Sequence, residues 1–427
     1  MCWLRPAWLR PLASTILLAA AAAFARPAIA QQNSGVDAFV AEVLQRNPGL
    51  RARRLSRDAA ALDASATGLY PDPEASVMLD NVPERHEGEM PMVRYQLSQM
   101  IPWPGKLGMM EDAAARRTDG AEADAKTRAL DLIRDAKRAY WMLLMNKGSR
   151  EVVAAARELL ETVTHTAVAR YGAGSGAHHD VARAKVELSM LDVELLDLDG
   201  ERIATLAMLN ALRDRPSASA VPEPAAPAFS PVGATVSLDR LERRAFEQRP
   251  ELENMRAMRR EEQVMAALAR RERYPDFMTS IWYNQMLGEP DTAGVMVGVV
   301  LPVFNVRRQG RLAEAADRRA SSAEGDVQAM QAMIRFQLGD ATRRIVTAER
   351  TLELLHSVGS PQANESFAAS LAAYSTGGTI DVTAVLQAWR ALQTTELARV
   401  EATVNWLNAL ADLERAVGGS WDDGVAR

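Results

Sequence analysis

The sequence has little cysteine and few aromatic residues. A single cysteine, Cys2, stands among 427 residues, which excludes an intrachain disulfide framework and any cysteine-based metal site. Aromatic residues make up only 5% of the chain, whereas Ala, Leu, Arg, Glu and Met are plentiful. This balance favours helices over a β-rich enzyme core. The formal net charge of −5 argues against a strongly basic nucleic-acid binder, so no nucleic-acid partner is expected.

The chain also lacks the local signatures of catalysis. It contains no Gly-x-Ser-x-Gly, no His-Glu-x-x-His and no Walker lysine motif, so we expect no enzyme and no cofactor. The run Gly172-x-Gly174-x-Gly176 is similar to a phosphate loop, but it joins two predicted helices rather than a strand and a helix. His178 and His179 are candidate transition-metal ligands, against an interpretation as exposed turn residues. The 19 methionines are interpreted as flexible core filler rather than a soft-metal relay.

The first thirty residues have the pattern of a secretory signal peptide. Arg5 and Arg10 form a positive region, residues 12–24 are apolar, and Ala28-Ile29-Ala30 is a small-residue cleavage site. The apolar run is too short for a spanning helix, although a retained N-terminal anchor helix is the alternative. Because Cys2 precedes the apolar run, we expect an exported chain without a lipid anchor.

Two halves of the chain repeat each other at offsets of 198 to 204 residues. Leu209-Asn210-Ala211-Leu212 recurs letter for letter as Leu407-Asn408-Ala409-Leu410, and five further matches keep the same order. Collinear matches of this kind predict a duplication. A stretch rich in Pro and Ala between the halves cannot continue a helix. The predicted organisation is a signal peptide (1–30), a first repeat (31–213), a Pro-rich linker (214–237), a second repeat (238–418) and a C-terminal tail (419–427).

Each repeat follows the same order of predicted elements: a helix, two strands, a very long helix and a return helix. In the first repeat these cover 36–68, 75–81, 92–100, 106–170 and 180–212; in the second they cover 238–273, 277–284, 294–301, 310–373 and 381–417. A 65-residue helix is about 100 Å long, so two shorter helices placed end to end match it. Such helices must bury their apolar stripes against one another.

Heptad spacing predicts that the long helices form coiled coils. The predicted seams are Leu132, Ala136, Ala139 and Leu143; Val152, Ala156, Leu159 and Val163; and Ala184, Leu188, Leu191, Leu195 and Leu198. Gly359-Ser360-Pro361 predicts a kink in the second long helix.

Apolar and polar residues alternate in the predicted strands. Val93, Tyr95 and Leu97 share one face, with polar residues between them. In many soluble proteins such a face packs on helices, but here the helices are committed to coiled coils. The alternation therefore predicts lipid-facing residues at Val93, Tyr95 and Leu97. Four strands cannot close a barrel, and an open edge in lipid leaves backbone groups unsatisfied, so the chain must form an oligomer.

Three motifs carry a resemblance to a known family: Ile101-Pro102-Trp103-Pro104-Gly105-Lys106 at a strand-to-helix junction, and the two turns that contain Tyr171 and Tyr374. The chain resembles the TolC-like outer-membrane efflux channels, and the first motif resembles their heavy-metal and cation efflux branch. The implied fold is mainly α with a small transmembrane β part. Duplicated long coiled-coil hairpins and four β-strands per chain would form a shared trimeric α/β barrel, with the Pro-rich linker at its equator.

The resemblance implies a homotrimer in the outer membrane of a Gram-negative bacterium, extending into the periplasm. It implies a passive duct for small molecules or metal cations, in keeping with a role in heavy-metal resistance. Outer-membrane lipid, a periplasmic membrane-fusion adaptor and an inner-membrane pump of the resistance-nodulation-division type are the implied partners. Two alternatives stay open: an outer-membrane duct for type I protein secretion, and a soluble periplasmic coiled-coil adaptor or spacer.

The two turns at which the long helices reverse lie at the end farthest from the strands. The resemblance makes them the periplasmic entrance and adaptor contact, through Tyr171, Gly174, Asp180, Tyr374, Gly377 and Asp381. Asp180 and Asp381 have two interpretations. They either line a cation-selective constriction or cap the return helices.

Overall fold

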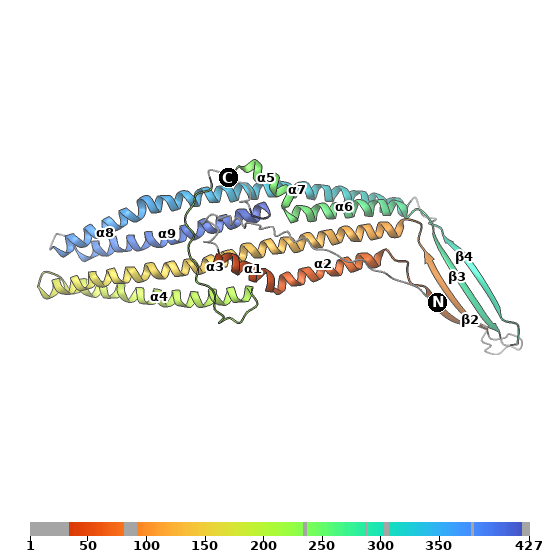
Figure 1. Cartoon of the computed structure of the whole chain (residues 1–427), viewed down its shortest axis with the longest axis horizontal. Helices are drawn as coiled ribbons and strands as arrows, with labels where there is room; N and C mark the ends of the chain where they lie inside the picture. The colour runs from red at the N-terminus through yellow and green to blue at the C-terminus, as the bar shows by residue number, and fades with distance from the viewer. Residues whose placement is uncertain are drawn as a thin grey trace, which may run out of the picture.

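The computed structural model describes residues 34–80, 92–233, 237–286, 288–302, 307–376 and 380–420. The predicted signal peptide, Gly377 and most of the predicted tail lie outside these residues. The molecule is long, with parallel rows of helices and a small sheet bent away at one end (Figure 1). Within the described ranges, no helix combines the length and apolar character needed to cross a membrane.

The first predicted helix of each repeat is divided in two, which corrects the prediction of single helices over 36–68 and 238–273. The observed pairs are α1 (Ser34–Arg46) with α2 (Pro48–Thr67), and α5 (Leu238–Gln248) with α6 (Pro250–Arg271). A proline begins the second member of each pair, and the residue before a proline is driven out of the helical region. Asn47 has ψ 121° and Arg249 has ψ 117°. The Asn47 side chain also accepts a hydrogen bond from the Leu50 amide, which caps α2.

The long helices form two hairpins that lie side by side. They are built from α3 (Lys106–Gly172), α4 (His178–Leu212), α7 (Gln309–Leu354), α8 (Ser360–Ser375) and α9 (Val382–Val417). In the half away from the sheet, α4, α3, α9 and α8 follow one another across the molecule (Figure 1). In the half nearer the sheet, α2 and α6 take the places of α4 and α9 beside α3 and α7.

The first predicted seam is confirmed, because all four of its members are buried. In the third predicted seam, Leu191 is buried and Leu188, Leu195 and Leu198 pack against the same core. The second seam is wrong in part. Val153 and Leu160 are fully buried, one position after the predicted members, whereas Leu159 is 36% exposed. Ala156 and Val163 are buried as predicted, so the seam keeps its heptad spacing, with Val153 and Leu160 in place of Val152 and Leu159.

The predicted kink in the second long helix is a π turn, Leu355–Gly359, between α7 and α8. Leu352 and the residues seven and fourteen positions before it are buried. Continuing from Leu352 in steps of seven gives positions 366 and 373 beyond the turn. The buried residues there are Phe367 and Tyr374, each one position later. A π turn holds one more residue than an α turn, so it absorbs this extra residue and keeps both segments facing α9.

The sheet contains four antiparallel strands in the order β1 (Glu74–Asp80), β2 (Met92–Ile101), β3 (Asp276–Met286) and β4 (Thr292–Val300). Each repeat contributes one hairpin, and β2 pairs with β3 to join them. The two outer strands, β1 and β4, each have one edge that no described strand pairs.

Candidate functional site

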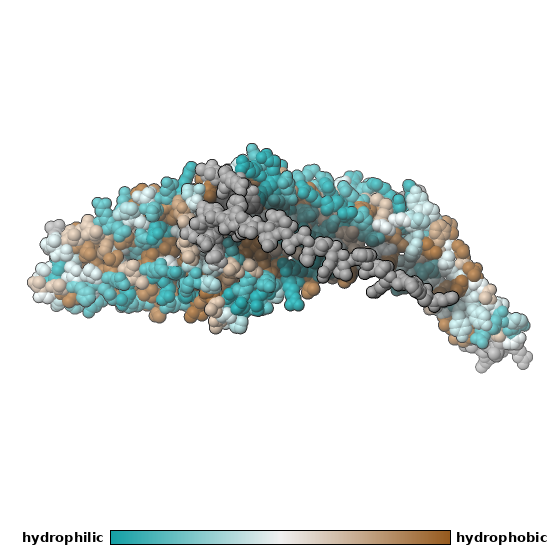
Figure 2. Space-filling view, viewed as in Figure 1, coloured by the Kyte–Doolittle hydropathy of each residue, from teal (hydrophilic) through white to brown (hydrophobic). Residues whose placement is uncertain are grey.

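One face of the sheet is apolar and exposed. Tyr95 and Leu97, two of the predicted lipid-facing residues, are 45% and 43% exposed, and half-buried Val93 shares their face. The register adds apolar neighbours on every strand, which include Val77, Leu79, Ile281, Tyr283, Val295, Val297 and Val299. Their exposed fractions reach 72% at Val295. Hydrophobic side chains gather where the body bends into the sheet (Figure 2). A continuous exposed apolar surface of this kind is typical of a site that contacts a membrane or another protein.

The opposite face of the sheet is polar and hydrogen-bonded. Arg94 Nε donates to Asn284 Oδ1 at 2.9 Å, and Asn284 Nδ2 donates to Thr292 Oγ1 at 3.1 Å. Gln96 Nε2 donates to Ser98 Oγ at 3.0 Å. The sheet is therefore amphipathic across its thickness, as a wall between lipid and water would be.

The junction between sheet and helices is fixed by residues from both repeats. Lys106 is buried, and its Nζ lies 2.9 Å from Asp276 Oδ1. The Trp103 amide donates a hydrogen bond to the same oxygen at 2.7 Å. The Trp103 ring stacks on Tyr274, with centroids 5.1 Å apart. Gly105 has φ 85°, and a Cβ there would lie 2.1 Å from an Arg271 nitrogen. The motif that carried the family resemblance therefore ties β2 and α3 to α6 and β3.

The far end of the hairpins brings together several predicted entrance residues. The Arg170 guanidinium lies 4.5 Å from the centroid of the Tyr374 ring and also donates to the Tyr374 carbonyl oxygen. Burial raises the pKa of Tyr374, and the nearby Asp180 carboxylate raises it further. The Tyr374 hydroxyl is buried without a hydrogen-bond partner among the described residues. Tyr171 is not part of this cluster: it is 50% exposed, and its ring meets His178 edge-on.

The two aspartates of the turns have different environments. Asp381 caps α9, because its carboxylate accepts a hydrogen bond from the Ala384 amide at 3.1 Å. The capping interpretation is wrong for Asp180, because α4 begins two residues earlier, at His178. Asp180 lies in the first turn of α4 and is 8% exposed. A carboxylate there still interacts favourably with the helix dipole.

The remaining predicted entrance residues are the two glycines, Gly174 and Gly377. Gly174 has φ 71°, a left-handed conformation that glycine adopts without strain, and it allows the tight turn after α3. Gly377 lies outside the described residues.

His179 Nε2 is 3.0 Å from Asp180 Oδ1, but the His179 side chain is 76% exposed. Among the described residues, no group of three or more His, Cys, Asp or Glu side chains is placed to hold a metal ion.

The links between the two hairpins could not be predicted from the sequence. Arg390 of α9 forms an ion pair with Glu187 of α4, and Arg183 Nη1 donates to Thr383 Oγ1 at 2.6 Å. Nothing in the local sequence marks these residues as partners. They hold the return helices together near the turns, so separating the hairpins requires these contacts to break.

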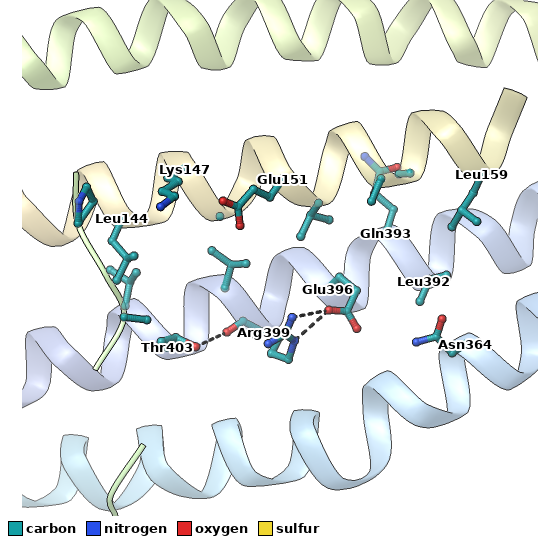
Figure 3. A pocket seen from close by; sticks show the side chains of 18 of the residues that line it. Leu144, Lys147, Glu151, Leu159, Asn364, Leu392, Gln393, Glu396, Arg399 and Thr403 are labelled. Carbon is teal, nitrogen blue, oxygen red and sulfur yellow. Dashed lines mark hydrogen bonds and ion pairs between the residues drawn. The ribbon is translucent and has the colours of Figure 1, made fainter. Parts of the chain in front are cut away.

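A groove of about 620 Å³ runs between α3 and α9, near the beginning of α8 (Figure 3). Leu159 and Val152, which the predicted seam had placed in the core, line this groove instead. Part of the linker, residues 224–226, borders it. On the α9 side, Arg399 Nε donates to Glu396 Oε2 at 2.9 Å. The groove is mixed in polarity, so it suits a helix or peptide surface better than an apolar ligand.

Comparisons with known proteins agree with this architecture. The family model described as outer membrane efflux protein matches residues 39–213 and 241–419. The outer-membrane channel OprN is 17% identical, with 91% of this chain and 90% of that chain covered and a TM-score of 0.78. The outer membrane protein VceC from Vibrio cholerae is 18% identical over 91% and 97%, with a TM-score of 0.74. CusC is 14% identical over 90% and 92%, with a TM-score of 0.77. No curated protein matches the sequence significantly.

Proposed function

The chain belongs to the outer membrane efflux protein family, and we propose that it is the outer-membrane channel of a tripartite efflux system. It is a passive duct that carries small molecules or metal cations outward, and its partners supply the energy. The observation that carries this proposal is the sheet, which has one exposed apolar face, one polar face and two unpaired edges.

The sheet accounts for oligomer formation. Each unpaired edge in lipid would leave a row of backbone donors and acceptors without partners, which costs several kcal/mol per group. Pairing β1 of one chain with β4 of the next removes every edge when the ring closes. Three chains give a closed barrel of about twelve strands, with the apolar face toward lipid and the polar face toward water.

The helices carry a second set of surfaces that support a homotrimer. Leu55, Leu62 and Leu69, spaced by seven residues along α2 and just after it, are 60–71% exposed. On α7, Leu312 and Leu354 are 49% and 62% exposed. Helices α2 and α7 lie on opposite long edges of the molecule (Figure 1). The heptad-spaced stripe of α2 on one edge and the exposed leucines of α7 on the other allow one copy to pack against the next in a closed ring.

The hairpin ends form the periplasmic entrance in this proposal. Tyr171 and Gly174 are exposed at the turn and contact a membrane-fusion adaptor, and the groove between α3 and α9, farther along the same hairpins, offers a second contact surface. Asp180 and Tyr374 are buried at the same end and Asp381 is exposed there, whereas Gly377 is included from the sequence alone. An inner-membrane pump of the resistance-nodulation-division type completes the system.

Two experiments test the channel. The chain is expected in the outer-membrane fraction as a heat-labile oligomer that detergent releases and salt does not. Recovery as a monomer in the soluble periplasmic extract would favour a coiled-coil spacer. In planar bilayers, the purified oligomer is expected to conduct, and Asp180→Asn with Asp381→Asn should lower its cation preference. An unchanged preference would leave Asp381 as a helix cap only.

A further inference from the structure

The methionines of the sheet all lie on its polar face. The four strands contain six, and the register places every one on the face of Arg94 and Ser280. Met92 pairs directly with Met286 and Met100 with Met278, whereas Met78 pairs with Arg94 and Met296 with Ser280. The apolar face of the described strands has none. Methionine therefore occurs on only one face of the sheet, and that face is the polar one.

Three of these methionines form a cluster near the helical end of the sheet, which we call the thioether cluster: Met100, Met278 and Met296. Directly opposed residues have Cβ atoms about 5 Å apart, and diagonal neighbours lie about 7–8 Å apart. Met100 and Met278 are opposed, and Met296 is diagonal to Met278. The residue opposite Met278 on β4 is Gly298, where a Cβ would lie 3.7 Å from the Met278 methyl carbon. The missing side chain leaves room for three long, flexible side chains to converge.

The interpretation of methionine as core filler does not account for this cluster. Met100 and Met296 are 46% and 38% exposed, so they do not fill a core. The neighbours on the same face are polar, such as Ser98 and Ser280, and the apolar face uses Val, Ile, Leu and Tyr instead. An uncharged thioether facing water contributes little to solubility, but it is a soft ligand that selects monovalent copper over hard cations.

A second trio, Met78, Met92 and Met286, lies at the other end of the same face. It is eight residues away along β2, or about 26 Å. Arg94 is the direct partner of Met78, so its positive charge disfavours a cation there. The thioether cluster has no charged residue as a direct cross-strand partner, since its partners are Gly298 and Ser280. It is the better site of the two.

We propose that the thioether cluster binds a soft monovalent cation, Cu(I) or Ag(I), on the water-facing wall of the barrel. The proposal rests on the proposed function in one respect, because the polar face lines the lumen only if the sheet closes. Three ligands from each of three chains would then surround the path. Binding by neutral thioethers without a thiolate suits a transit site, since a conducted ion must also leave.

The test uses the purified full-length oligomer in detergent and silver nitrate in a chloride-free buffer. Titration calorimetry should detect Ag(I) binding, and Met100→Leu/Met278→Leu/Met296→Leu should weaken it at least tenfold. Leucine conserves volume, so the sheet should still form. The matched control replaces three exposed helix methionines, Met142, Met145 and Met258, by leucine and should bind Ag(I) as the wild type does.

Three results would overturn the proposal: no Ag(I) binding by wild type, equal affinity in the cluster variant, or equal affinity for Zn(II), which prefers nitrogen and thiolate ligands. Conductance of the same samples separates the two proposals. A conducting wild type that binds no Ag(I) refutes the thioether cluster alone. A wild type that binds Ag(I) but never conducts refutes the proposed channel and leaves the cluster in place.

Discussion

Placing a charge on the apolar face of the sheet gives the sharpest test of the barrel. Tyr95 lies in the first half of β2, and its cross-strand partners are Val77 and Tyr283. Neither partner carries a negative charge that could neutralise a guanidinium. Tyr95→Arg should therefore cost about 2–4 kcal/mol per chain near the bilayer midplane, or about 6–12 kcal/mol for three chains. The loss should appear as a smaller heat-labile oligomer fraction and a lower denaturant midpoint in lipid vesicles.

The matched control is Gln96→Arg, one residue along the same strand. Its side chain lies on the polar face and donates to Ser98 Oγ at 3.0 Å, so an arginine there stays in water. Its cost should be under about 1 kcal/mol, because substitutions facing the lumen mainly change selectivity. Equal losses for the two variants would refute the assignment of faces. A larger loss for Gln96→Arg would mean that Gln96 faces lipid and Tyr95 faces water.

Three further predictions concern the helices. Burial raises the pKa of Glu251, but hydrogen bonds from Arg249 and Arg415 outweigh burial and lower the pKa below 4.5. The ionised Glu251 therefore stabilises the fold at neutral pH, and this contribution should be lost as the pH falls below about 4.5. Glu251→Gln should remove that acid dependence from the thermal midpoint. Tyr374→Phe should leave the melting temperature unchanged or slightly higher, because the hydroxyl is buried and unpaired among the described residues; a fall of several degrees would reveal a hidden partner. Deleting Ser357 should convert the π turn to regular helix and preserve oligomer formation, whereas a one-residue deletion in the middle of α3 should prevent it.

Much of the fold could be predicted because its signals are periodic. The strands at 92–100 and 277–284 and the long helix over 106–170 differ from the observed elements by at most two residues at each end. The breaks before Pro48 and Pro250 were missed for a physical reason. Apolar periodicity continues across each break, because both helices pack on the same neighbour, whereas proline changes only the backbone of the residue before it.

The candidate site was predictable only in part, as the aspartates of the two turns illustrate. An Asp-Val pair ends each turn in the sequence, so the two positions look equivalent. In the structure, α4 begins at His178 and α9 at Val382, so only Asp381 precedes its helix. Duplication preserves the letters, but the length of each turn determines where the helix begins and which aspartate can reach its free amides.

The methionine arrangement shows what a strand pattern cannot reveal alone. Within one strand, the period of two already places Met92 and Met100 on one face. Whether Met278 and Met296 share that face depends on the pairing register, and a shift of one residue would send them to the lipid side. The register depends in turn on the joint of Trp103, Lys106 and Asp276, which fixes where β2 ends relative to the beginning of β3. A polar anchor at the helical end therefore determines which side chains line the wall of the barrel.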